Sequence, residues 1–337
     1  MLPRDEEKYR RLRETLGLNY EITRLYALYL ERFPEAITKE MIDEVTEGGA
    51  MSRETALVAI LSAMFDIDVD RGARDRRLLR EYLVPSVRIM DPKRYTENPY
   101  YKNIKIPNVT DGRWELKTES YKPYRGVICG DMTVTDDLCE VPPLGFFEEE
   151  FRFPAVLEDG NEWMTLTPVD LDTCDEAIER AHGKVITFGL GLGYYAYMVS
   201  EKECVESVTV IEKSPDVIAL FKKHILPQFP RSDKVRIINA DAFEYAERIM
   251  PREGYTYAFV DTWRDASDGA PMYERMKPLE RLNAGTEFDY WIENFLVSRL
   301  RSQKYAEIEK KRAEGAPDAP RSYEEIRDTL KNPVRCK

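Results

Sequence analysis

The stretch that decides the fold is Lys184–Tyr194, KVITFGLGLGY, in which an apolar run leads into three alternating glycines. The next residues, Tyr194–Val199, are mostly apolar or aromatic and continue as a helix would. This order predicts a strand, a glycine turn and a helix start. Because glycine lacks a Cβ and adopts positive φ, such a turn lets a ligand approach the backbone, and the helix start favours an anionic group. The simpler alternative is that the glycines serve packing alone.

Downstream of this turn, strand and helix patterns alternate regularly. Apolar strands are predicted at Val208–Glu212, Val235–Asn239 and Tyr257–Asp261, the first two each followed by a helical pattern, and Phe288–Trp291 is a candidate fifth strand. Upstream, Thr167-Pro168-Val169-Asp170 has the composition of a capped helix start. The alternation predicts a Rossmann-like, doubly wound α/β fold with a mostly parallel sheet and ligands beyond the carboxyl ends of its strands.

The spacing of apolar residues divides the rest of the chain into further regions. Residues 1–83 carry apolar stripes at helical spacing and predict a helical N-terminal region. Residues 84–165 are richer in Pro, Gly and alternating runs, which predicts a small β-rich segment. We expect the Rossmann-like domain to span 166–300 and a helical tail to span 301–337. The helical N-terminal region carries no recognisable motif. Its role stays open among three: it could cover the active site, bind a protein substrate or form a homodimer.

Composition narrows the function classes. The 337 residues carry a net charge of −12, with 33% charged and 43% hydrophobic residues, so the chain is long enough for two domains. The acidic balance argues against nucleic-acid binding. The five cysteines include no C-x-x-C pair, and the charged start has no secretory segment. No apolar run is long enough to span a membrane. These features predict a cytoplasmic protein that is not associated with a membrane. With only two histidines, a His-based zinc site is not expected, and no metal ligand is assigned.

Acidic residues stand at or just after the ends of three successive predicted strands, namely Glu212, Asp241 and Asp261. Glu212 lies about 20 residues after the glycine turn, where an acid can accept hydrogen bonds from ribose hydroxyls. Taken singly, each acid could instead be a helix cap or a solvated charge. A nicotinamide-dependent dehydrogenase would share the turn and the first acid, but its fingerprint requires Gly or Ala where Tyr194 stands.

With these features, residues 163–291 resemble the core of the class I S-adenosylmethionine-dependent methyltransferases, with some similarity to the spermidine synthase-like branch. The resemblance implies that the glycine turn lies against the methionine part of S-adenosylmethionine, that the second strand end binds ribose and that the turn after the third strand binds adenine. The implied cofactor-binding residues are Gly189, Leu190, Gly191, Gly193, Glu212, Lys213, Asp241 and Ala242. Two features depart from the family pattern: Thr187 replaces an acid that often contacts the cofactor's amino group, and two further strands are not recognisable after residue 300.

The function expected from this resemblance is methyl transfer to an unidentified acceptor by direct displacement. Such an enzyme mainly holds the nucleophile in line with the methyl group and, where required, removes a proton. Asp261 is the candidate catalytic residue for orienting the nucleophile or acting as base. The fourth strand runs into Thr262-Trp263-Arg264 without the Pro-Pro-Tyr signature of nucleobase amine methylation, which, with the acidic charge, argues against DNA methylation. A small-molecule acceptor is expected rather than a macromolecule. The aromatic residues that could line the substrate pocket, or simply pack, are Trp163, Tyr194, Tyr195 and Trp263.

Two alternatives remain. An aminopropyltransferase resembling spermidine synthases would share the fold, a preceding β-rich segment and an Asp at the fourth strand. That family usually carries an acid within the glycine turn, where Leu190 and Leu192 stand in this chain. The other alternative is a protein that binds S-adenosylmethionine without catalysing a reaction.

Overall fold

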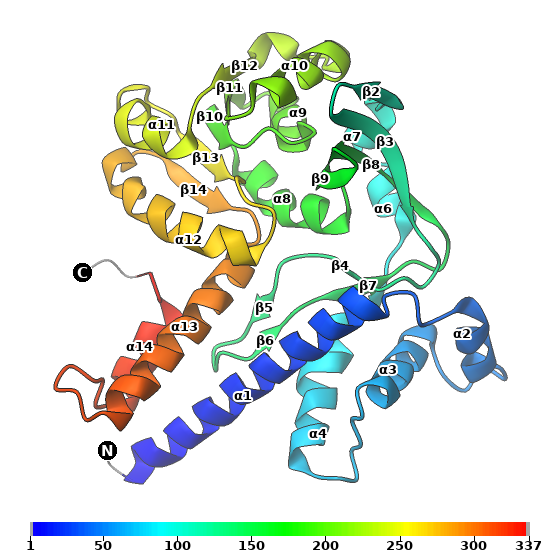
Figure 1. Cartoon of the computed structure of the whole chain (residues 1–337), viewed down its shortest axis with the longest axis vertical. Coiled ribbons are helices and arrows are strands. Elements are labelled where there is room, and N and C mark those ends of the chain that lie inside the picture. The colour runs from blue at the N-terminus through cyan, green and yellow to red at the C-terminus, as the bar shows by residue number, and fades with distance from the viewer. Residues whose placement is uncertain (1–2, 335–337) are drawn as a thin grey trace. The chain divides into compact units, whose positions relative to one another are not determined.

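The computed structural model describes residues 3–334 and contains both helices and strands (Figure 1). The helices are α1 (Pro3–Arg32), α2 (Lys39–Thr46), α3 (Arg53–Met64), α4 (Ala73–Arg77), η1 (Leu78–Leu83), α5 (Val84–Ser86), α6 (Pro92–Thr96), α7 (Pro99–Asn103), α8 (Pro168–Arg180), α9 (Tyr194–Ser200), α10 (Pro215–His224), η2 (Leu226–Gln228), η3 (Ser232–Lys234), α11 (Ala242–Arg248), η4 (Met250–Arg252), α12 (Ala266–Met276), η5 (Lys277–Asn283), α13 (Glu293–Ala313) and α14 (Tyr323–Lys331). The strands are β1 (Val87–Ile89), β2 (Val109–Asp111), β3 (Trp114–Tyr121), β4 (Val127–Ile128), β5 (Thr133–Val134), β6 (Glu140–Val141), β7 (Leu144–Phe146), β8 (Phe151–Glu158), β9 (Asn161–Thr165), β10 (Gly183–Phe188), β11 (Val205–Glu212), β12 (Val235–Asn239), β13 (Tyr257–Val260) and β14 (Glu287–Tyr290).

The chain forms two compact units, each built from separate segments of sequence. Unit 1 comprises residues 1–90, 121–151 and 294–337, and unit 2 comprises residues 91–120 and 152–293. The division of the chain into four consecutive regions stays a prediction. Between residues 3 and 334, no helix combines the length and the apolar character that crossing a membrane would require.

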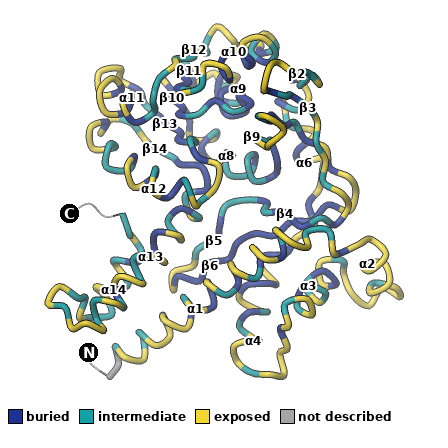
Figure 2. The backbone as a smooth tube through the Cα atoms, in the orientation of Figure 1, coloured by how far each residue is buried: buried dark blue, intermediate teal, exposed yellow. Residues whose placement is uncertain are grey.

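Unit 2 contains a five-stranded sheet in the order β12-β11-β10-β13-β14, and every neighbouring pair is parallel. Helices α8, α9 and α10 lie on one side of this sheet and α11 and α12 on the other (Figure 1). The central strands β10 and β13 are buried along most of their length (Figure 2), as expected for strands covered on both faces. This arrangement confirms the predicted parallel α/β core.

The five strands agree closely with those predicted from periodicity, including the fifth, which is β14. The family that the sequence resembles has two further strands after this point. In the described chain only the helices α13 and α14 follow β14, up to residue 334, so these two strands are missing. The sheet is therefore shortened at this edge. The helix predicted to begin at Thr167 is also present, and Thr167 forms a capping box with Asp170 at the start of α8.

A second sheet has the strand order β2-β3-β8-β9. Its β8–β9 hairpin turns at Asp159 and Gly160, whose φ angles are +50° and +77°. Positive φ at both central residues is typical of the tight hairpin turns that Asp-Gly favours. The turn returns the chain along β9 toward Met164, whose side chain lies against Gly191 of the glycine turn.

Unit 1 is mostly helical and has its own apolar core. Side chains of α1, α3 and η1 pack with those of the small sheet β1-β7-β4, and Ile22, Leu57 and Phe146 are among the residues fully removed from solvent. A second cluster joins α1 to α13 and α14 through Leu12, Ile308 and other apolar side chains. Burial of these stripes accounts for the helical periodicity of the N-terminal sequence.

Candidate functional site

The glycine turn that follows β10 adopts positive φ at all three glycines, with values of +102° at Gly189, +49° at Gly191 and +76° at Gly193. Each glycine also faces a protein group that a Cβ would strike. That group is the backbone carbonyl oxygen of Asp261 for Gly189, the Met164 side chain for Gly191 and the Phe221 ring for Gly193. Packing against the Asp261 backbone explains Gly189 without reference to a ligand, whereas Gly191 faces only the end of the flexible Met164 side chain.

Replacing Gly189 by Ala is expected to destabilise unit 2 by about 1–3 kcal/mol, through strained φ and the clash with the backbone of Asp261. The matched control is Gly254→Ala, because Gly254 also has positive φ but has open space where a Cβ would lie. Urea unfolding of both variants separates the clash from the φ strain. Equal losses of stability in the two would contradict the close approach of β10 and β13.

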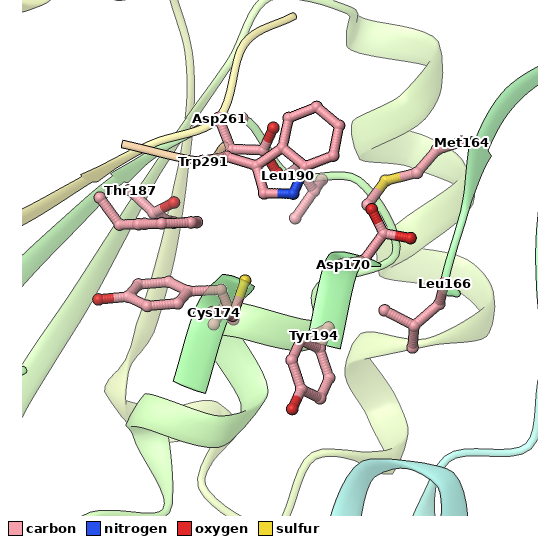
Figure 3. A pocket seen from close by; sticks show the side chains of 13 residues that line it. Met164, Leu166, Asp170, Cys174, Thr187, Leu190, Tyr194, Asp261 and Trp291 are labelled. Atoms are coloured by element: carbon pink, nitrogen blue, oxygen red, sulfur yellow. The ribbon is translucent and has the colours of Figure 1, made fainter. Parts of the chain in front are cut away.

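A cavity lies at the carboxyl ends of β10 and β13, between the glycine turn, α8 and α9 (Figure 3). The volume open to the centre of a water molecule is about 20 Å³, enough for one water, so side chains must move before a larger ligand enters. Its lining combines carboxylates with aromatic and sulfur-containing side chains. The lining residues are Met164, Leu166, Asp170, Cys174, Thr187, Gly189, Leu190, Tyr194, Tyr195, Ala196, Phe259, Asp261 and Trp291.

Asp261 follows β13 and is held by its backbone, whose N–H donates to the carbonyl oxygen of Phe188 (2.8 Å). Within the described chain no hydrogen bond or ion pair reaches its carboxylate. Burial in the cavity raises the pKa of Asp261 to about 8, and the nearby charges of Asp170 and Glu212 act in the same direction. A carboxyl group with such a pKa can hold or release a proton near neutral pH.

Asp170 is the second carboxylate of the cavity, and α8 positions it. Its Oδ2 accepts hydrogen bonds from the backbone N–H (2.7 Å) and the hydroxyl (2.9 Å) of Thr167. Burial raises its pKa to about 6, partly opposed by these hydrogen bonds and reinforced by the charge of Glu162. Asp170 is therefore mostly ionised at neutral pH, whereas Asp261 is mostly protonated.

Glu212, at the end of β11, forms a hydrogen bond with the backbone of the glycine turn. One oxygen accepts the Leu190 N–H (3.2 Å) and the other accepts the Ser214 N–H (2.7 Å). Because an ionised carboxylate has about four acceptor positions, both oxygens can still accept ribose hydroxyls. The structure thus places Glu212 directly beside the turn, one hydrogen bond away from the cavity lining.

The residues expected to bind adenine lie at the start of α11. Asp241 caps this helix by accepting the N–H groups of Phe243 (3.0 Å) and Glu244 (3.2 Å), and Ala242 is the first helical residue. The exposed Lys213 places its Nζ 3.6 Å from Asp241. The helix-cap alternative for Asp241 is therefore observed, and cofactor contacts by Lys213, Asp241 and Ala242 stay predictions.

The four candidate aromatic residues separate into two pairs. Tyr194 and Tyr195 are buried and line the cavity, and the Tyr195 ring stacks on Phe259 with 4.4 Å between centroids. Trp163 and Trp263 do not belong to the lining. The Trp163 ring lies beneath the Arg264 guanidinium at 5.4 Å, and Trp263 is buried with its centroid 6.4 Å from that of Tyr290.

Sequence reasoning missed several cavity residues, of which Asp170, Trp291 and Met164 matter most. Trp291 directly follows β14, so its position after a parallel strand could have indicated it as a site residue, as the same position indicated Asp261. Asp170 was recognisable only as a helix cap. Met164 reaches the glycine turn because of the path that the β8–β9 hairpin takes in space. No local sequence pattern predicts that Met164 contacts the turn. Among residues 3–334, no group of three or more His, Cys, Asp or Glu is arranged to hold a metal ion.

Comparison with known proteins gives a limited result. No protein-family model and no curated protein matches the chain. Solved structures with partial likeness include the precorrin 8w decarboxylase of Methanobacterium thermoautotrophicum, with 18% identity over 34% of this chain and 56% of that chain and a TM-score of 0.26. The spermidine synthase of Thermotoga maritima matches with 16% identity over 45% and 59% of the two chains and a TM-score of 0.31.

A candidate SAM-dependent methyltransferase from Streptococcus mutans also matches, with 15% identity over 38% of this chain and 36% of that chain and a TM-score of 0.29. The matched region spans less than two thirds of each of these three proteins. Likenesses this weak identify neither a family nor an activity for the chain.

Proposed function

We propose that the chain is an S-adenosylmethionine-dependent methyltransferase that acts on a small-molecule acceptor. The observation that carries this proposal is the position of Asp261: a carboxyl group without a hydrogen-bonding partner in the described chain, with a pKa of about 8, in a cavity beside the glycine turn of a parallel sheet. The carboxyl ends of parallel strands are where such folds bind ligands.

The chemistry of the site fits the cofactor. Glu212 keeps acceptor positions for ribose hydroxyls next to the glycine turn. The cavity combines acidic side chains with the buried indole N–H of Trp291, so it offers both charges and a donor to a polar ligand. When bound, S-adenosylmethionine supplies a methyl group on a sulfonium sulfur, which a nucleophile can displace.

The chain's own contribution to catalysis is positioning and proton transfer. Asp261 accepts a proton from the acceptor, or orients it, and its pKa near neutral pH suits a general base. Tyr195 and Phe259 form an apolar wall that limits the access of water to this carboxylate. Met164 covers Gly191 and must move before the cavity can admit the methionine part of the cofactor.

The test is calorimetric binding of four ligands to the full chain: S-adenosylmethionine, S-adenosylhomocysteine, decarboxylated S-adenosylmethionine and NADH. Tight binding of the first two, with weak binding of the others, is the expected result. Binding of NADH alone would overturn the proposal and would restore the dehydrogenase alternative. Cofactor binding without turnover in any acceptor screen would leave a protein that binds S-adenosylmethionine without catalysis.

A second candidate is a spermidine synthase-like aminopropyltransferase, and one observation favours it. The cavity lining contains Asp170 and Asp261 but no Arg, Lys or His in the described chain. A cofactor without a carboxylate, and an amine acceptor, would suit such an acidic lining. Preference for the decarboxylated ligand in the same measurement would select this candidate.

A further inference from the structure

The loop between β13 and α12 carries four successive polar side chains whose polar groups have no partner among residues 3–334. Thr262 Oγ1 and Trp263 Nε1 are buried and form no hydrogen bond there. Asp261 precedes them with a carboxyl group that only like charges approach. Arg264 follows them with a guanidinium whose one recorded contact is an aromatic ring. Because buried polar groups are seldom left unpaired, the loop indicates that partners from outside the chain are missing.

The backbone of this loop is fixed by the start of α12. Asp268 accepts the N–H groups of Arg264 (3.2 Å) and Asp265 (3.1 Å), and Asp265 accepts the Ser267 N–H (2.6 Å). The two carboxylates that are closest to Arg264 on the C-terminal side are thus used to cap the helix, and neither forms an ion pair with the guanidinium. The charge of Arg264 is left for another anionic group.

Trp163, the ring beneath Arg264, occupies an irregular position in its sheet. Val156 on β8 opposes Met164 on β9, and the next residue along β8 opposes Glu162. Trp163 is therefore left without an opposite residue, which is the arrangement of a β-bulge. Bulges re-aim a side chain and are common next to binding sites, so the sheet itself turns Trp163 out of the regular alternation.

Trp163 and its neighbours hold the Arg264 side chain in place. The guanidinium carbon lies over the Trp163 ring, 5.4 Å from its centroid. Trp114 on β3 packs edge-on against the same ring, with 5.3 Å between centroids and 87° between planes. A guanidinium that lies over a ring keeps N–H groups at its edge, and this edge matches the two oxygens of a carboxylate.

The Arg264–Trp163 pair lies between two segments that line the cavity. Trp163 is next in sequence to Met164, and Arg264 follows Asp261 by three residues; Met164 and Asp261 both belong to the lining (Figure 3). Within the described chain the lining itself contains no Arg, Lys or His. Arg264 is therefore the basic residue that the chain places nearest in sequence to Asp261, at the edge of the sheet where ligands bind.

We propose that Arg264, held on the Trp163 ring, binds a carboxylate group of the methyl acceptor and so makes the site selective for anionic acceptors. This inference rests on the proposed function in one respect: the bound carboxylate is then part of the acceptor. The carboxylate site itself does not depend on the cofactor. An amine acceptor, as an aminopropyltransferase requires, would show the opposite preference.

The experiment measures the dissociation constants of three probes that share a phenyl ring: benzoate, benzamide and benzylamine. Ligand-observed NMR titrations use the full chain, with and without S-adenosylhomocysteine. The wild type should bind benzoate roughly tenfold more tightly than benzamide, the scale of a hydrogen bond to a charged group. Since the chain has a net charge of −12, non-specific attraction would instead favour benzylamine, so a preference for benzoate requires a local site.

Arg264→Gln should remove this preference and leave the affinity for benzamide unchanged. Trp163→Leu should weaken benzoate by roughly twofold to fivefold, the scale of an exposed cation–π contact, because the guanidinium loses its platform. Trp163→Phe keeps an aromatic face and should retain most of the affinity. This difference separates the support of Arg264 from a general effect of mutating Trp163.

The matched control is Arg275→Gln. The Arg275 guanidinium also lies over an aromatic ring, that of Phe243 (4.0 Å), and it forms no ion pair within residues 3–334. This variant should keep the full preference for benzoate. Thermal melting checks that all the variants are folded.

The outcomes distinguish this inference from the proposed function, because binding of S-adenosylhomocysteine is measured on the same samples. Absence of a preference for benzoate in the wild type, or an equal preference in Arg264→Gln, would overturn the inference and leave the function standing where S-adenosylhomocysteine binds. Tighter binding of benzylamine would overturn it in favour of an amine acceptor. An Arg264-dependent preference for benzoate without any binding of S-adenosylhomocysteine would retain the carboxylate site and reject the cofactor.

Discussion

Asp261→Asn is expected to reduce turnover by about 10²- to 10⁴-fold, the usual contribution of a general base. The affinity for S-adenosylhomocysteine should change little, because asparagine has nearly the same shape and the ligand needs no proton transfer. In the wild type the rate should rise with pH and level off above about 8, where Asp261 becomes ionised. This rise should be absent from the residual activity of the variant. Unchanged turnover in a folded variant would exclude Asp261 from the chemistry.

The same substitution has an expected effect on stability that separates a functional carboxylate from a structural one. An acid whose folded-state pKa exceeds its unfolded value binds more protons when folded, so stability falls as pH rises between the two values. For Asp261 this interval runs from about 3.8 to about 8. Asparagine removes the effect, so the gain in melting temperature over the wild type should grow from pH 5 to pH 8.

The parallel core was predictable because its signals are local. Each buried strand is a short apolar run bounded by a turn, and the order of strands and helices leaves few topologies. Parallel strands end at one edge of their sheet, so residues at strand ends are expected to lie close together. On this basis Glu212 beside the glycine turn and Asp261 in the cavity were also predictable. The packing of α13 and α14 against α1 was not predictable from the sequence, because it depends on contacts between segments that are distant along the chain.

The site was less predictable, because one residue can satisfy two requirements. Asp170 forms a capping box, which fully explains an acid at that position and hides its second place in the cavity. Trp291 could have been found, since it follows a strand as Asp261 does. The glycines illustrate the opposite case: their spacing is typical of a ligand-binding turn, yet at Gly189 the contact with the Asp261 backbone is by itself sufficient to require glycine.

The largest stability effect is expected in unit 1, at a buried ion pair. Arg301 on α13 contacts the Glu140 carboxylate on β6, and each side chain is only 4% exposed. Ser298 donates its hydroxyl to the other Glu140 oxygen (2.8 Å), and Arg301 Nε donates to the Leu330 carbonyl oxygen in α14 (2.8 Å). Burial lowers the pKa of Arg301 to about 10, so the guanidinium stays charged at neutral pH.

Arg301→Met is expected to reduce the free energy of unfolding by about 3–5 kcal/mol, because it leaves the Glu140 carboxylate buried without a counter-ion. The measurement is urea unfolding followed by far-UV circular dichroism. The matched control is Arg11→Met, which breaks an exposed pair with Glu7 (2.8 Å) in the same unit and should cost less than about 1 kcal/mol.

Adding Glu140→Gln to Arg301→Met should recover a large part of the loss, because a neutral amide is far less costly to bury than an unpaired carboxylate. The glutamine can still accept the Ser298 hydroxyl, so the recovery isolates the charge from the hydrogen bond. If the double variant were no more stable than Arg301→Met, the loss would instead come from the Arg301 contacts with α14, and the ion pair would contribute little to holding α13 against β6.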